Sequence, residues 1–255
     1  MRLNKQDFSD IQAHIDLTRT RLAAIGLTFH VDHDMQAFVN YIGSQEDTHG
    51  VPSSHDPRKC WLHPGNAFWV YVKHPASGQI IGCQAQRLIL TEDFVQDCLS
   101  QTLFANLYPS LDAAPVGVDE NGDSLISGRV IYGGGLYIHP DWRGEGLLIF
   151  NRASRTIALR HFQADYFCGL QLNTPRRRAM ALTGFAFSHV RPFIKGGLPG
   201  KPQADDVQLS WSSRREWMET IRRELANRDA STHTPRRTLG PSDPLREVAS
   251  AGNLA

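Results

Sequence analysis

The stretch GLYIHPDWRGEGLLIF, residues 135–150, has the pattern of a strand end, a turn with two glycines and a helix start. Pro140 ends the apolar strand pattern, and an apolar run typical of a helix begins at Leu147. Gly144 and Gly146 permit backbone conformations in which consecutive N–H groups converge on an anion at a helix N-terminus. The stretch therefore predicts a phosphate-binding turn, with a pyrophosphate as the expected ligand.

A second pattern follows downstream. An apolar run, residues 166–172, ends at Asn173, and Gly184 with Phe185 comes eleven residues after Asn173. The whole arrangement resembles the GNAT superfamily of acyl-CoA-dependent N-acyltransferases. That family carries the motif Arg/Gln-x-x-Gly-x-Gly/Ala, which residues 143–148 match except at Leu148.

The resemblance implies an α/β fold, with a mixed, mostly antiparallel central sheet and helices on both faces. Two central strands are expected to part and admit the pantetheine arm of the cofactor. The donor is expected to be acetyl-CoA or another acyl-CoA. The residues expected to bind it are Ile138, Arg143, Gly144, Glu145, Gly146, Leu147, Leu148 and Asn173.

Three positions depart from the family pattern. Leu148 stands where a Gly or Ala is usual, Arg176 where an Ala is common, and Met180 where a Tyr is common. The family's tyrosine returns a proton to the leaving thiolate, which a thioether cannot do. These departures favour a coenzyme A-binding module without efficient chemistry, whereas a thiol of pKa about 8.5 leaves readily without an acid. We therefore favour an acyltransferase.

A run of three glycines, residues 133–135, interrupts the strand that precedes the turn. Such a run indicates either a bulge with close backbone approach or room for a facing aromatic side chain, and the sequence does not separate the two. By the resemblance, a bulge turns a backbone N–H toward the thioester carbonyl, so Ile138 or its immediate neighbours would supply the oxyanion contact.

The catalytic residues stay unassigned. The family often places a glutamate on this strand as general base, and the nearest counterpart is Tyr132, whose pKa near 10 makes it a poor base. Other candidates by type and place are Glu92, Asp93, His139 and Glu145, none ranked above the others.

Periodicity and turn residues predict the remaining organisation. Residues 1–226 are expected to form one domain that begins with helices, carries an insertion at about 91–124, and is followed by a disordered tail, 227–255. A polar, turn-rich segment, 44–59, is expected to be a loop that shapes the acceptor pocket. Helices are predicted at 7–24, 35–42, 93–107, 177–183 and 213–226, and strands at 27–31, 68–72, 79–88, 130–138, 185–190 and 207–211.

Composition narrows the class of protein. A formal net charge of +1 argues against a nucleic-acid partner, and no apolar stretch is long enough to cross a membrane. The start of the chain lacks a signal-peptide core, so a cytoplasmic location is expected. Four scattered cysteines and eleven histidines without ligand spacing predict no metal site.

The expected acceptor is an amine on a small molecule or on a protein. Three consecutive arginines, residues 176–178, read either as a solvated helix start or as a contact for the cofactor's 3′-phosphate or an acidic acceptor. The same basic cluster would suit an acidic acyl carrier protein as the acyl donor. An acyl-carrier-protein-dependent N-acyl synthase is therefore a third alternative, beside the acyl-CoA-dependent enzyme and the binding module. A homodimer is left open.

Overall fold

The computed structural model describes residues 3–46, 48, 50–100, 102–104, 126–143, 147–195 and 206–228. Its centre is a seven-stranded sheet in the order β1-β2-β3-β4-β5-β7-β6. The β4–β5 pair is parallel and the other neighbouring pairs are antiparallel, which confirms the expected mixed, mostly antiparallel sheet. The strands are β1 (Thr28–Asp32), β2 (Ala67–Lys73), β3 (Ile80–Thr91), β4 (Gly128–Ile138), β5 (Tyr166–Leu172), β6 (His189–Ile194) and β7 (Val207–Ser213).

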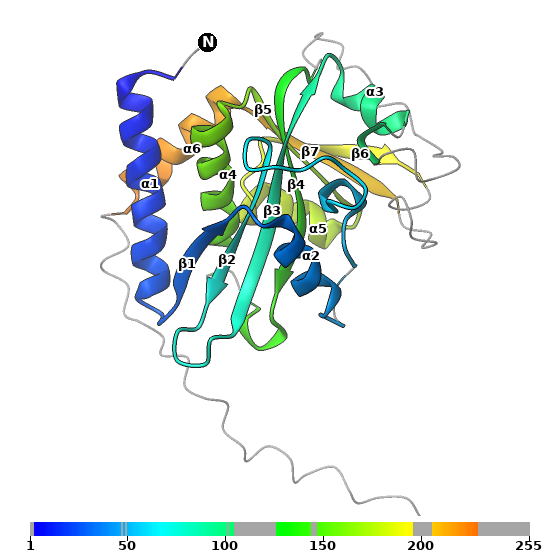
Figure 1. Ribbon diagram of the computed structural model, residues 1–255. Helices are drawn as coiled ribbons and strands as arrows, with labels where there is room; N and C mark the ends of the chain where they lie inside the picture. Colours follow the sequence, from blue (N-terminus) through cyan, green and yellow to red (C-terminus); the bar gives the residue numbers. More distant parts are fainter. Residues whose placement is uncertain are drawn as a thin grey trace, which may run out of the picture.

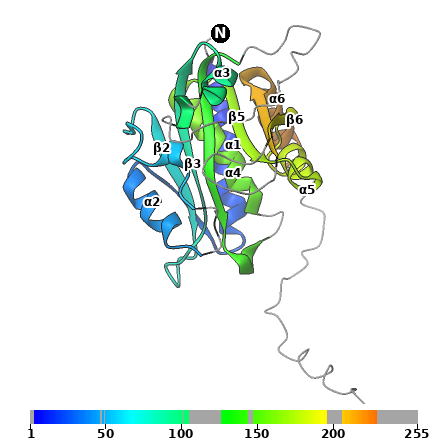
Figure 2. The same ribbon diagram turned by 90° about the vertical axis from the view of Figure 1, so that its right-hand side faces the viewer.

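Helices cover both faces of the sheet. α1 (Lys5–Ala23), α4 (Leu148–Phe162) and α6 (Arg214–Ala226) pack together against one face (Figure 1). α2 (Met35–Gly43) and α3 (Phe94–Leu99) belong to the opposite face, and Figure 2 shows α2 and α6 on either side of the sheet. After β5 come the short α5 (Pro175–Ala179) and one π-helical turn, Met180–Gly184.

The alternation of side chains along β4 divides the hydrophobic core. Ile131 belongs to the core under α1, α4 and α6, whereas Val130 and Tyr132 on either side of it pack with Phe94 of α3 on the other face. A third cluster, around Phe38 of α2, lies over β2 and β3. β4 is therefore buried on both faces, as expected for a central strand.

Two predicted elements need correction. The helix predicted at 93–107 ends at Leu99, where Ser100 caps it, and residues 101 and 105–124 of the predicted insertion lie outside the described residues. The strand predicted at 185–190 is wrong, since β6 begins at His189. Phe187 N–H donates instead to the carbonyl of Ala181 at 2.9 Å, and Ala186 adopts a positive φ of 54°, so the chain turns here.

The first and last described helices, α1 and α6, agree with the helices predicted at 7–24 and 213–226. α1 begins with a capping box, in which Asn4 and Asp7 bond each other's backbone N–H, and α6 begins with the same device formed by Ser213 and Glu216. The predicted disordered tail lies outside the described residues from position 229 onward. Among the helices that are described, none is both long and apolar enough to cross a membrane.

Candidate functional site

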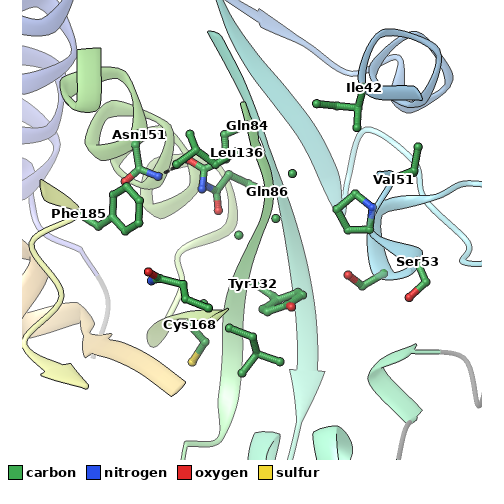
Figure 3. Close-up of a pocket in the computed structure, with 18 of the residues that line it drawn as sticks. Ile42, Val51, Ser53, Gln84, Gln86, Tyr132, Leu136, Asn151, Cys168 and Phe185 are labelled. Atoms are coloured by element: carbon green, nitrogen blue, oxygen red, sulfur yellow. Dashed lines mark hydrogen bonds between the residues drawn. The ribbon is translucent and has the colours of Figure 1, made fainter. Parts of the chain in front are cut away.

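The parallel join between β4 and β5 is short. Pairing covers only Val130–Tyr132 with Tyr166–Cys168. Beyond it, Gly133–Leu136 and Gly169–Leu172 line a cavity of about 430 Å³ where the two strands part (Figure 3). The opening agrees with the split expected to admit a pantetheine arm.

The wall of this cavity comes from both sides of the sheet. Figure 3 places Asn151, Gln84 and Gln86 on one side of β4, and Ile42, Val51 and Ser53 on the other. The cavity therefore passes through the sheet, as a site must if it brings two reactants together from opposite faces.

Each glycine of the 133–135 run allows a close approach. A Cβ added at Gly134 would lie 2.6 Å from the His55 ring, and one at Gly135 would overlap the Phe38 ring. Gly135 also has a φ of 61°, which favours glycine. Both alternatives left open by the sequence hold, because the run is a bulge and also makes room for facing rings.

The bulge on β4 lies at the end of the glycine run. The register between β3 and β4 shifts around Gln84, which leaves Gly135 and Leu136 without an opposite residue in the ladder. Ile138 pairs regularly opposite Gly82, and its carbonyl accepts a hydrogen bond from Arg143 Nε at 3.2 Å. Gly135 and Leu136 line the cavity, and Ile138, predicted to supply or adjoin the oxyanion contact, is not among the residues that line it.

The predicted phosphate-binding turn is described only at its edges. Gly144, Glu145 and Gly146 lie outside the described residues. α4 begins at Leu148 after the buried Leu147, and no side chain caps its first turn, so the N-terminal N–H groups of α4 are left for another acceptor. The helix start agrees with the prediction, and the anion site stays a prediction.

Residues after β5 surround the open end of the split. Asn173, predicted to contact the cofactor, donates its backbone N–H to the carbonyl of Asp206 at 2.6 Å and is not part of the cavity wall. Of the three arginines, Arg177 lines the cavity. Burial and then the charges of Arg176 and Arg143 lower the pKa of Arg177, which indicates a concentration of positive charge at this end.

A polar network lines the α4 side of the cavity. Asn151 Nδ2 donates to Gln84 Oε1 at 2.6 Å, and Gln86 Nε2 donates to Ser154 Oγ at 2.7 Å. Gln86 Oε1 has no hydrogen-bond partner among the described residues. Buried amides cost free energy unless they are bonded, so this network provides acceptor capacity that a ligand can use.

Arg155 extends this network. It is 3% exposed, its guanidinium stacks 4.4 Å from the Phe187 ring and 4.2 Å from the Trp217 ring, and Nη2 donates to Asn151 Oδ1 at 3.1 Å. Burial, and then the charge of Arg152, lower its pKa to about 9. Its Nε and Nη1 have no partner within the described chain. Arg155 is thus a buried cation that retains unused donors.

The opposite wall holds a serine and a neutral histidine. Ser54 Oγ lies 3.0 Å from His55 Nδ1, and His55 Nε2 lies 3.1 Å from the carbonyl of Tyr132. Because that carbonyl can only accept, Nε2 carries the proton and Nδ1 accepts from the Ser54 hydroxyl. Burial and then the charge of Arg87 lower the pKa of His55 to about 3, so the ring is uncharged at neutral pH.

The general-base candidates predicted from sequence do not meet at the cavity. Glu92 is exposed, Asp93 caps α3 by accepting from the N–H groups of Val95 and Gln96, and His139 caps the short turn that follows β4. Glu145 lies outside the described residues. Tyr132 does line the cavity, where burial raises its pKa and makes it a still poorer base.

The charged side chains in the described part of the cavity wall are all positive. Among the described residues that form it, three are cations and none is a carboxylate. The cations are Lys59, Arg155 and Arg177.

Sequence reasoning missed the polar residues of the wall, although two signals existed. Gln84 and Gln86 alternate on one face of an apolar strand, and Arg155 follows Asn151 at helical spacing on the buried side of α4. His55 gave no signal, because it lies in a polar segment that was expected to be a loop.

No protein-family model matches the chain, and no curated protein matches it at a significant level. The fold is similar to those of many solved structures, among them three acetyltransferases. Arabidopsis thaliana NAA60 in complex with acetyl-CoA is 11% identical over 74% of this chain and 99% of that one, with a TM-score of 0.45. A variant of the spermidine N-acetyltransferase SpeG from Vibrio cholerae is 10% identical, over 76% and 96%, with a TM-score of 0.45. The ribosomal-protein-S5-alanine acetyltransferase from Vibrio fischeri is 12% identical, over 75% and 95%, with a TM-score of 0.42.

Proposed function

Because the mixed, mostly antiparallel sheet parts at its centre as expected for a GNAT-like fold, we propose that the chain is an N-acyltransferase that moves an acetyl or other acyl group from an acyl-CoA to an amine. The observation that supports this most directly is the cavity through the sheet, which opens where β4 and β5 part and which the bulge at Gly135 and Leu136 borders. Fold alone does not establish an activity, so the proposal rests on this geometry together with the turn motif at 143–148.

The donor would lie along the α4 face of the split. Its pyrophosphate would be held at the uncapped N-terminus of α4 and the predicted turn before it, with Arg143 and Arg177 nearby to offset negative charge. Its thioester would lie at the bulge, where the backbone N–H groups of Gly135 and Leu136 can stabilise the oxyanion.

The transfer forms an N–C bond and breaks the thioester C–S bond. The neutral amine attacks the thioester carbonyl, the tetrahedral oxyanion collapses, and coenzyme A leaves as a thiolate that takes up a proton from water. With Met180 in place of the family's tyrosine, no side-chain acid is assigned to this last step, since a thiolate is a good leaving group. The proton that the amine loses also passes to water, because no carboxylate lines the described cavity wall.

We assign Ser54 to orient the amine. Ser54 lines the cavity, and its hydroxyl donates to the neutral His55 ring at 3.0 Å and also hydrogen-bonds the Tyr132 side chain. One lone pair of the hydroxyl is left to accept a hydrogen bond from the attacking nitrogen. The acceptor then enters from the α2 side, opposite the donor.

The test is calorimetry of the full chain with acetyl-CoA and with coenzyme A, repeated with Gly146→Glu, which adds bulk and negative charge to the predicted turn. Ser9→Glu, on the exposed side of α1, is the matched control for the added charge. The proposal expects micromolar binding that Gly146→Glu abolishes and Ser9→Glu preserves, followed by release of free thiol when a panel of amines is added. Absence of binding by the unaltered chain would contradict it and favour a carrier-protein donor.

A further inference from the structure

Arg155 is the most deeply buried of the charged side chains described in the cavity wall. A buried guanidinium ordinarily faces a carboxylate, because an unpaired buried charge is costly. Glu224, the carboxylate that acts on Arg155 electrostatically, is already held by Arg152 at 2.8 Å and by His14 at 3.1 Å. Within the described chain, Arg155 makes no ion pair of its own.

The surroundings of Arg155 fix its position. The Phe187 and Trp217 rings stack against the guanidinium, and Asn151 binds one of its terminal nitrogens. Nε and Nη1 remain without partners, and Gln86 Oε1 in the same wall is also unpartnered. The cation is therefore held in place and keeps two donors unpaired within the described chain, an arrangement that suits a carboxylate ligand.

Arg155 lies at the closed end of the split. Phe187, on which it stacks, is the nearest side chain to the position of a Cβ on Gly169, at 3.4 Å, and Gly169 is the first β5 residue beyond the paired segment. The N-terminus of α4 lies at the open end, seven residues or about 10 Å back along the same helix. Gly169 follows Cys168, the partner of Tyr132, so this end lies on the far side of the bulge at Gly135 from the open end. A donor that runs from the α4 N-terminus and places its thioester at the bulge would therefore meet Arg155 with its acyl chain.

We propose that Arg155 binds the terminal carboxylate of a dicarboxylic acyl group, so that the preferred donor is a succinyl- or glutaryl-type thioester of coenzyme A. This inference rests on the proposed function and specifies which class of acyl-CoA is the preferred donor. The carboxylate would accept from Nε and Nη1 of Arg155 at the end of the split, beyond the bulge that holds the thioester. The α4 side of the cavity then selects the acyl chain, and the Ser54 side receives the amine.

The test compares binding of acetyl-, butyryl-, succinyl- and glutaryl-CoA to the full chain, using calorimetry. Succinyl- or glutaryl-CoA is expected to bind at least about tenfold more tightly than butyryl-CoA, the size expected for charge-assisted hydrogen bonds. Arg155→Met should abolish this preference and leave butyryl-CoA binding intact. Arg160→Met, which removes the same charge from the exposed side of α4, should preserve it.

A melting curve of Arg155→Met separates loss of recognition from loss of fold. A methionine between Phe187 and Trp217 removes a buried unpaired charge, so the variant is expected to melt at the same or a higher temperature. A structural role for Arg155 would instead lower the melting temperature. Rescue of part of the preference by Arg155→Lys, which keeps the charge but not the planar fork, would support the assignment.

Three results would overturn it in distinguishable ways. Equal affinity for butyryl- and succinyl-CoA would refute the inference and leave the acyltransferase proposal standing. A loss of affinity of Arg155→Met for an amine that bears a carboxylate, with the acyl panel unchanged, would assign Arg155 to the acceptor instead. Failure of every thioester to bind the unaltered chain would overturn both proposals.

Discussion

Leu148 packs into the space left by Gly184. A Cβ on Gly184 would lie 2.6 Å from Leu148 Cδ1, and the Gly184 carbonyl is held by Arg152 Nε at 2.8 Å, so the glycine has little room to move away. Leu148 stands where the GNAT motif usually has Gly or Ala. The departure at the start of α4 is therefore matched by a small residue on the π-helical turn.

This pairing predicts coupled effects of mutation. Gly184→Ala should lower the free energy of unfolding by about 1–3 kcal/mol, because the added methyl group overpacks against Leu148. In the background of Leu148→Ala the same change should cost much less. A double-mutant cycle measured by urea denaturation tests this, and additive effects of the two changes would contradict the pairing.

Gly134→Ala should also be destabilising, by about 1–3 kcal/mol, since the new Cβ would lie 2.6 Å from the His55 ring. Gly43→Ala is a matched control, because its Cβ would meet only Val51 Cγ2 at an ordinary 3.8 Å. Urea denaturation of the two variants compares them directly. Equal stability of Gly134→Ala and the unaltered chain would mean that His55 does not approach the bulge.

His55 should make stability depend on pH. Its pKa falls from 6.5 to about 3 on folding, so below pH 6.5 the unfolded chain takes up a proton that the folded chain refuses. The contribution of the neutral His55 ring to the free energy of unfolding is therefore complete above pH 6.5. It is lost as the pH falls toward 3, by at most about 1.4 kcal/mol per pH unit. Urea midpoints measured between pH 6.5 and pH 3 should fall less steeply with decreasing pH in His55→Asn than in the unaltered chain. His74→Asn, in the β2–β3 turn, should keep the original slope.

Ser54→Ala should reduce acyl transfer while leaving donor binding unchanged. The loss of one hydrogen bond that orients the amine is expected to lower kcat/KM by about tenfold to a hundredfold. Ser53→Ala is the matched control, since Ser53 also lines the cavity but does not bond His55. Thiol release under saturating acyl-CoA gives the rates, and equal activity of the two variants would remove Ser54 from its assigned role.

Much of the fold could be predicted because its signals are local. The β2–β3 hairpin follows from two apolar runs around a turn-rich loop, and α6 follows from the Ser213 cap with Glu216 three residues later. The mixed, mostly antiparallel sheet with two parting central strands was predicted from the family resemblance of the turn and Asn173 regions. The strand predicted at 185–190 was wrong because Phe185 and Phe187 bond back to the π-helical turn. Their N–H groups donate to the carbonyls of Met180 and Ala181, which a local apolar pattern does not reveal.

The candidate site was less predictable because residues far apart in sequence build it. Ser54 and Arg155 lie a hundred positions apart and on opposite faces of the sheet, and only the split between β4 and β5 puts them in one cavity. Their chemistry depends on burial, which composition does not reveal. The glycine run pointed to the bulge, but which residues stand unpaired in it depends on a register shift that glycine content alone does not reveal.

The three-residue join of β4 and β5 divides the sheet into two antiparallel halves, β1–β4 and β5–β7. A seam this short offers few backbone hydrogen bonds to resist opening, so amide hydrogens of Gly133–Leu136 should exchange with solvent faster than those of β2. A thioester lying in the seam would contact both halves at once. Its binding should slow amide exchange on β4 and β5 together. The bound substrate would then bridge the two halves of the sheet where their strands do not pair.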